Sequence, residues 1–168
     1  CQKLPEYPLI FSRYNYCMQI WIDADACPTA VRDIVMRAAL RLKVSVVFVA
    51  NKIVALPESA LFRFQLVAAG PDQADLYIVE QARPGDLVVS HDIPLAAALV
   101  PKGVVVIDPR GVVFDGNNIA ERLAVRDLMH DLRDTGTITG GPAPYSDKEK
   151  RRFASSFDRE LTRLHRQA

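Results

Sequence analysis

Short apolar runs alternate with amphipathic segments along most of the chain. Residues Gln19–Asp23 (QIWID) predict a short buried strand that ends in an acid. Residues 44–49 (VSVVFV) form an almost continuous β-branched run, which is typical of a central parallel strand covered on both faces. The pattern predicts four further strands, at residues 62–67, 87–90, 104–107 and 112–114.

Helices are predicted between these strands. Residues 29–43 carry apolar side chains at helical spacing, and Pro28 suits a first helical turn, where a missing N–H costs nothing. Asp72 is placed to cap a helix that runs to about Arg83. Further helices are expected at residues 93–100, at residues 117–133 with Ile119, Leu123, Leu128 and Leu132 near one face, and at residues 146–167, where Ser146 and Glu149 match a capping box.

This alternation predicts right-handed βαβ units and an α/β fold with a mostly parallel sheet. We expect one domain over residues 18–134, with the Gly/Pro-rich loop and last helix of residues 135–168 packed on it. Residues 1–17 show neither the helical nor the strand spacing of apolar residues. We therefore expect an N-terminal extension outside the fold and Met18 as the biological start. A genuine but poorly ordered N-terminal arm is the alternative.

Composition narrows the class of protein. Hydrophobic residues make up 49% and charged residues 24%, as in ordinary globular domains. The net charge of +1 excludes a polycation, so nucleic-acid binding would need a local basic patch. The three cysteines, Cys1, Cys17 and Cys27, give no disulfide or zinc pattern, which favours a reducing cytoplasm. No apolar run approaches the roughly 20 residues that cross a membrane, so no membrane partner is expected.

Acids follow several of the predicted strands. Asp23 and Asp25 come after the first strand, and Ser90 and Asp92 after the strand at residues 87–90. Asp72 and Asp75 lie one turn apart at the start of a helix. Because ligands bind beyond the carboxyl ends of parallel strands, these acids are candidates for a common site.

Carboxylates brought together repel each other unless a cation neutralises them, and hard divalent cations prefer oxygen ligands. The sequence therefore predicts a Mg²⁺ or Mn²⁺ site. Each acid has a plainer interpretation as a loop residue or a helix cap. Asp86 and Asp108 precede or join turns, and we expect them to be turn residues. Cys27 is placed at a helix N-terminus, where a thiol can be reactive, but a small structural residue is the favoured interpretation.

Several motifs in order resemble the YaiI/YqxD family of bacterial proteins: IDADACP, GPDQADLYIVE, PGDLVVSHDIPLA, IDPRG, RLAVRDLMHDLR and TGGPAPYS. The resemblance runs from Met18 essentially to the C-terminus. That family is largely uncharacterised and is placed among the PIN-like metal-dependent nucleases. The resemblance implies a three-layer PIN-like fold, with Asp23, Asp75 and Asp92 as catalytic metal ligands and Asp72 as a helper. Asp25 would be a further ligand or a group that orients the ligands. The helix motif departs from the common form at Leu76 and Tyr77.

The leading hypothesis is a cytoplasmic hydrolase that cuts a phosphodiester, RNA rather than DNA, with Ser90, Asn51 and Arg110 as candidates for substrate binding. A second is a non-catalytic module that binds a nucleotide or nucleic acid. A third is a phosphatase of the haloacid-dehalogenase type, since Asp23 and Asp25 form its D-x-D motif. Against this third hypothesis, Cys27 stands where that class carries a threonine, and no matching lysine motif is evident. The sequence indicates no oligomeric state.

Overall fold

The computed structural model describes residues 17–141 and 143–168, so the predicted N-terminal extension lies outside the described residues except for Cys17. The chain forms an α/β fold around a sheet of six strands in the order β3-β2-β1-β4-β5-β6. The strands are β1 (Gln19–Asp23), β2 (Ser45–Ala50), β3 (Phe62–Leu66), β4 (Leu87–Val89), β5 (Val105–Ile107) and β6 (Val113–Phe114).

Five α-helices occur in the described residues, together with a short 3-10 helix at Val100–Lys102. Every strand and helix predicted from the hydrophobic pattern is present, and the ends differ by only a residue or two. The helices are α1 (Thr29–Leu42), α2 (Gln73–Gln81), α3 (Ile93–Leu99), α4 (Ile119–Asp134) and α5 (Asp147–Gln167).

The sheet is parallel from β3 to β5, and β6 pairs antiparallel with β5. The order of the strands reverses at β1, which lies between β2 on one side and β4 on the other. Ile22 of β1 is in register with Val89 of β4, so Asp23 and Ser90 follow at the same level of the sheet. In doubly wound folds this reversal opens a crevice beyond the carboxyl ends of the two strands.

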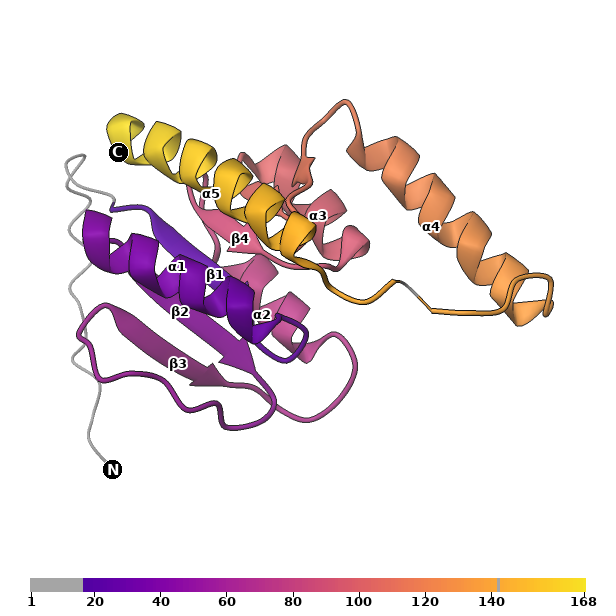
Figure 1. Cartoon of the computed structure of the whole chain (residues 1–168), viewed down its shortest axis with the longest axis horizontal. Coiled ribbons are helices and arrows are strands. Elements are labelled where there is room, and N and C mark those ends of the chain that lie inside the picture. The colour runs from indigo at the N-terminus through magenta and orange to yellow at the C-terminus, as the bar shows by residue number, and fades with distance from the viewer. Residues whose placement is uncertain (1–16, 142) are drawn as a thin grey trace.

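Two apolar cores hold three layers together. On one face of the sheet, α1 and α5 lie side by side (Figure 1) and pack on Ile22 and Phe48. On the other face, α2 and α3 pack on Trp21 and Val49. Phe153 and Phe157 of α5 are fully buried and stacked at 5.3 Å, and burying each contributes roughly 1.5–3 kcal/mol. The C-terminal helix is therefore part of the main core.

The turn between β5 and β6 lies directly against α5. Gly111 adopts a φ of +88°, and a Cβ built there would meet backbone atoms of Arg152 and Phe153 at 2.7 Å. The Ser156 hydroxyl donates a hydrogen bond to the carbonyl of Gly111 at 2.9 Å. Only glycine allows this conformation and this approach together, which explains the Pro-Arg-Gly turn. At the start of α5, Ser146 and Glu149 form the predicted capping box.

Asp86 is more than the turn residue that the sequence predicts. Its backbone closes a turn with Arg83, but its carboxylate is fully buried at the start of β4. The carboxylate accepts hydrogen bonds from the backbone N–H of Gln19 at 2.8 Å, the indole N–H of Trp21 at 3.0 Å and the backbone N–H of Arg83 at 2.9 Å. Asp86 thus ties β1 to the preceding loop at the amino end of the sheet.

The helix α4 departs from the expected packing. It projects away from the three layers (Figure 1), and none of its residues is buried. Ile119 packs on the core beside α3, and the half-buried residues of α4 are Ile119, Leu123 and Leu132, whereas Leu128 is exposed. The amphipathic pattern therefore predicts the helix, but Val125, Leu128 and Met129 remain exposed.

Among the described residues, no helix combines the length and the apolar character that crossing a membrane requires.

Candidate metal centre

The candidate site lies where the strand order reverses. Asp23 ends β1, and Ser90 follows β4, the neighbouring strand. Backbone hydrogen bonds continue just beyond both strands. The N–H of Ala24 donates to the carbonyl of Val49 at 2.8 Å, and the N–H of Ser90 donates to the carbonyl of Ile107 at 3.1 Å. The loops that follow are consequently fixed at the carboxyl edge of the sheet, the position where parallel sheets bind ligands.

Three acids meet at this edge. Asp72, Asp75 and Asp92 each offer a carboxylate oxygen, and these oxygens all lie within 4.8 Å of one another. Asp72 and Asp75 come from the start of α2, and Asp92 from the start of α3. Residues remote in sequence are thus brought within reach of a single cation.

Asp92 has two structural roles here. Its Oδ1 accepts a hydrogen bond from the backbone N–H of Leu95 at 2.8 Å, so it caps α3. Its own backbone N–H donates to the hydroxyl of Ser90 at 3.1 Å. Ser90 is only 2% exposed, which favours a role in positioning Asp92 rather than direct contact with a substrate. The plain interpretation of Asp92 as a helix cap is correct, and the cap also fixes its carboxylate among the acids.

Asp75 carries the most perturbed carboxylate of the site. Burial, followed by the charges of Asp92 and Asp23, raises its pKa from 3.8 to about 7. Its Oδ1 is buried and has no hydrogen-bond partner within the described part of the chain. Asp75 lies in the first turn of α2, where the helix dipole favours negative charge, so it is better placed than an acid in a helix interior.

Asp72 does not cap α2 as the sequence predicts. It occupies the N-cap position, but its side chain makes no capping hydrogen bond, and its φ of 62° is left-handed. Aspartate tolerates this conformation better than most residues. The left-handed turn leaves the Asp72 carboxylate in the acidic group with Asp75 and Asp92.

Asp23 and Asp25 lie beside this group but outside the set that spans 4.8 Å. Burial and then the charge of Asp25 raise the pKa of Asp23, and Asp92 adds to the effect. The carboxylate of Asp25 accepts a hydrogen bond from the backbone N–H of Asn51 at 2.7 Å. A cavity of about 140 Å³ joins the two parts of the site, and Asp23, Asp25, Asn51, Asp72 and Asp75 all line it.

The donor set fits a hard divalent cation. The clustered side chains offer only carboxylate oxygens, which are the ligands that Mg²⁺ and Mn²⁺ prefer. Burial raises the pKa of Asp75 most, and the charges of Asp92 and Asp23 raise it further; a cation would relieve that repulsion between the acids. The buried Oδ1 of Asp75 without a partner is a position where such an ion would supply the missing contact.

A second cavity of about 200 Å³ opens near the loops that follow β4 and β5, and His91, Asp108, Arg110 and Tyr145 line it. His91 Nδ1 lies 3.1 Å from Asp108 Oδ2, and the Tyr145 hydroxyl donates to the carbonyl of Pro109 at 3.0 Å. The hydrogen bond with Asp108 raises the pKa of His91 against an opposing effect of burial.

Asp108 and Arg110 also shape the turn after β5. Asp108 is a turn residue, as predicted. Its carbonyl accepts a hydrogen bond from the backbone N–H of Gly111 at 2.8 Å, and its Oδ1 accepts one from the backbone N–H of Arg110 at 2.6 Å. The sequence did not indicate its pairing with His91, although both residues follow adjacent strands. The Arg110 guanidinium bonds to the carboxylate of Glu149 and the carbonyl of Ala143, which fixes Arg110 beside the second cavity.

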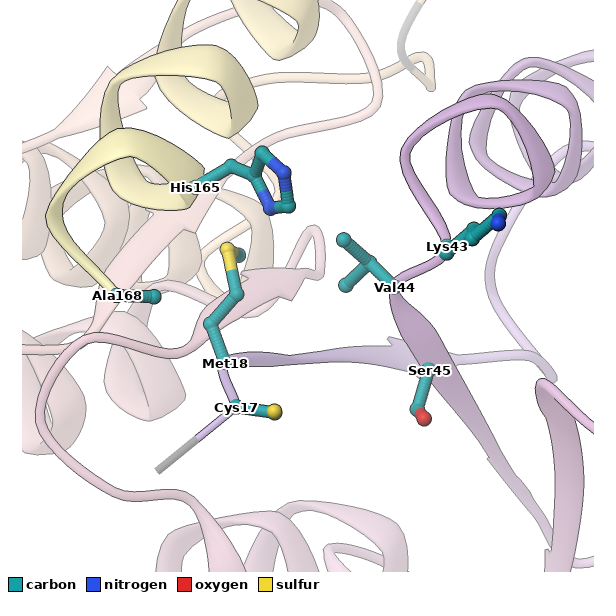
Figure 2. Close-up of a pocket in the computed structure, with 7 residues that line it drawn as sticks. All are labelled: Cys17, Met18, Lys43, Val44, Ser45, His165 and Ala168. Atoms are coloured by element: carbon teal, nitrogen blue, oxygen red, sulfur yellow. The ribbon is translucent and has the colours of Figure 1, made fainter. Parts of the chain in front are cut away.

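Two further features are Cys27 and a pocket at the amino edge of the sheet. Cys27 is buried, and burial raises the pKa of its thiol to about 12, so the structural interpretation of this cysteine is favoured. Figure 2 shows a pocket of about 290 Å³ near the starts of β1 and β2, at the opposite edge of the sheet from the acids. Cys17, Met18 and His165 are among its lining residues, and none of the described residues that line it is acidic.

Comparison with known proteins gives a consistent assignment. Residues 21–163 match a protein family described as "Uncharacterized BCR, YaiI/YqxD family". A UPF0178 protein of Myxococcus xanthus is 58% identical over 147 residues, which is 88% of this chain and 96% of that protein. A UPF0178 protein of Pseudomonas fluorescens is 54% identical over 151 residues, or 90% of this chain and 100% of that protein. No solved structure matches the chain significantly.

Proposed function

Because the chain belongs to the YaiI/YqxD family, which is described as uncharacterised, we propose a function from its own site: divalent-cation-dependent hydrolysis of a phosphodiester in nucleic acid, RNA rather than DNA. The approach of Asp72, Asp75 and Asp92 to within 4.8 Å at the carboxyl edge of the sheet carries this proposal. The resemblance to PIN-like nucleases supports the same chemistry, with Asp23 and Asp25 adjoining the acids.

Asp75 and Asp92 would hold the cation, with Asp72 completing the set and Asp23 and Asp25 adding negative charge beside it. A bound Mg²⁺ or Mn²⁺ would supply a Lewis acid for the phosphate and a water of lowered pKa. The chain itself contributes rigidity, since the capping bond to Leu95 and the Ser90 hydroxyl both fix Asp92.

Asp23 is placed to orient a water molecule or to accept its proton. It lines the cavity with Asp75, and burial and its acidic neighbours raise its pKa, which makes its carboxylate a better proton acceptor. Asp25 is held in place by the backbone N–H of Asn51. The backbone of Asn51 is therefore committed to this contact, and its side chain remains the candidate for a substrate bond.

The second cavity suits the part of the substrate that extends beyond the reacting phosphate. Asp25 lines the first cavity and the next residue, Ala26, lines the second, so both cavities adjoin the loop that follows β1. Arg110 and the imidazole of His91 bring donors to a lining that also includes Tyr145 and prolines. Nucleic-acid phosphates bind such cations, and bases pack on flat apolar surfaces, which favours single-stranded substrate.

A nuclease assay tests the proposal. Purified wild-type protein is incubated with Mn²⁺ and matched single-stranded RNA and DNA, and we expect cleavage, faster for RNA. Asp75→Asn keeps the size of the side chain and removes its charge, so activity should fall by ~10²-fold or more. Asp127→Asn, an exposed acid on α4, is the matched control and should cleave like the wild type. An Asp75→Asn variant as active as the wild type would contradict the proposal.

A separate measurement addresses the cation. Because a ligand that binds only the folded state stabilises it, Mn²⁺ should raise the Tm of the wild type and leave that of Asp75→Asn nearly unchanged. A rise in both proteins would place the ion elsewhere. Wild-type protein that binds RNA and Mn²⁺ without cleaving would instead favour the non-catalytic binding module.

A further inference from the structure

The outward side of α5 carries basic side chains and no acid. Successive residues turn by about 100° around a helix, so the side chains opposite the buried Phe153, Phe157 and Leu161 follow from the sequence. Apart from Ser155 and Thr162, all of these outward side chains are basic. Six exposed residues make up what we call the α5 basic face: Lys148, Arg151, Arg152, Arg159, Arg163 and Arg166.

The acids of α5 lie at the borders of this face, at Asp147, Glu149, Asp158 and Glu160. Asp158 is turned towards α1, where it pairs with Arg41. Glu160 is a single acid shared by two members of the face, Arg159 and Arg163. The other four members have no ion pair within residues 17–141 and 143–168: Lys148, Arg151, Arg152 and Arg166. The face therefore keeps most of its positive charge.

The α5 basic face begins beside the candidate site. Glu149, the neighbour of Lys148, bonds to Arg110, which lines the second cavity. At the far end of α5, His165 lines the pocket at the amino edge of the sheet (Figure 2). At 1.5 Å per residue, the face extends roughly 27 Å from Lys148 to Arg166. A track of positive charge thus leads away from the second cavity along the molecule.

The chemistry of the face suits the phosphates of nucleic acid rather than a lipid surface. A helix that lies on a membrane inserts its apolar side chains, but the apolar side of α5 is in the core with Phe153 and Phe157. Five of the six basic residues are arginines, whose forked guanidinium matches phosphate oxygens. They recur at intervals of one or two helical turns, and a nucleic-acid strand offers one charge per nucleotide along its length.

We propose that the α5 basic face binds the backbone of a polynucleotide strand whose reacting phosphate lies at the acids. This inference rests on the proposed function and names its substrate class, a strand of several nucleotides rather than a dinucleotide or another small phosphodiester. A dinucleotide held at the acids is too short to follow α5. The face therefore adds affinity only for longer strands.

Fluorescence anisotropy of labelled single-stranded RNA, with the full chain and a chelator, tests the track without cleavage. We expect an RNA of about 15 nucleotides to bind, with an affinity that falls steeply as salt is added. The triple variant Lys148→Gln/Arg151→Gln/Arg166→Gln removes three phosphate contacts. It should raise Kd by at least ~10-fold and reduce the slope of log K against log salt by about 2.

The matched control is the triple variant Arg122→Gln/Arg126→Gln/Arg133→Gln on α4, which changes the net charge of the protein by the same amount. Glutamine preserves helix propensity in both variants, and circular dichroism checks that both stay folded. We expect the control to bind RNA like the wild type. An equal loss of affinity in the two variants would reduce the effect to overall charge and exclude a specific track on α5.

Other results would also overturn the inference. These are a wild type that binds anionic vesicles but not RNA, a triple α5 variant that binds RNA as tightly as the wild type, and a dinucleotide that competes as well as the unlabelled long RNA. Because binding is measured without cleavage, a protein that binds in the expected way but never hydrolyses RNA would refute the proposed hydrolysis and leave the polynucleotide track supported.

Discussion

The carboxylate oxygens of Asp75 and Asp92 lie within 4.8 Å of each other, although one residue belongs to the first turn of α2 and the other caps α3. Each helix start on its own is an ordinary place for an aspartate. Their proximity follows from the topology, because each helix follows a parallel strand and so starts at the carboxyl edge, and both helices pack on the same face of the sheet. The repulsion between the two charges has measurable consequences.

Asp75 should make the cation-free protein less stable as the pH rises. Its pKa is about 7 in the folded state and 3.8 as the ordinary value, so the folded state holds the proton more tightly than the unfolded state. The resulting stability is fully present below about pH 4 and is lost as the pH rises through 7.

Asp75→Asn should remove this dependence. At pH 8 with a chelator, we expect the variant to be more stable than the wild type by only ~1 kcal/mol, or roughly 2–4 °C in Tm, because solvent screens part of the carboxylate. The difference should shrink at pH 4. Thermal unfolding of both proteins across this range is the measurement, and a wild type whose Tm rises from pH 4 to pH 8 relative to the variant would contradict the assignment.

The His91–Asp108 pair predicts a change in an imidazole pKa. The hydrogen bond that the Asp108 carboxylate accepts from His91 is the largest cause of the raised pKa of His91, so Asp108→Asn should lower that pKa. An NMR titration of the His91 ring in both proteins measures the shift directly. Asp134→Asn, which removes the acid paired with His130 on α4, is the control variant and should leave the pKa of His91 unchanged.

Gly111 should resist substitution by alanine. The added methyl group would meet backbone atoms of α5 at 2.7 Å, at a φ of +88° that already disfavours any side chain. We expect Gly111→Ala to lower the free energy of unfolding by roughly 1–3 kcal/mol. Gly116→Ala is the control, since a methyl group added there would meet nothing within 4 Å. Urea unfolding of the two variants gives the comparison, and equal losses would exclude the close approach as the cause.

The buried carboxylate of Asp86 should be important for stability. Asp86→Ala leaves the N–H groups of Gln19, Trp21 and Arg83 without this acceptor. Because buried donors without partners are costly, we expect a loss of ~2–4 kcal/mol in urea unfolding followed by circular dichroism. Asp86→Asn retains one acceptor oxygen and should lose less. A loss below that of a typical surface substitution would contradict this role.

The sequence predicts the fold of this chain well because its elements have clear local patterns. The apolar run of β2 is buried from Val46 to Ala50, as expected of a central parallel strand, and the capping box marks the start of α5. The packing of α4 could not be predicted in the same way. Its amphipathic pattern indicates that one face needs cover, but it does not say whether the cover comes from the same molecule.

The site is only partly predictable for a similar reason. Position after a strand identifies Asp23 and Asp92 as candidates, but it does not reveal distances between residues on different elements. Asp72 illustrates the limit, since a residue expected to cap α2 instead turns left-handed and joins the acids. The structural role of Asp86 is hidden in the sequence because a buried carboxylate in a turn has the same local pattern as an exposed one.

The bond between the Trp21 indole and Asp86 gives the protein an optical reporter of its own. Trp21 is the sole tryptophan, it is 5% exposed, and its ring meets Tyr77 of α2 edge-on. Its fluorescence therefore reports simultaneously on the central strand and on the helix that carries Asp75. Emission that shifts toward the red on unfolding allows the sheet to be followed in solution without any attached dye.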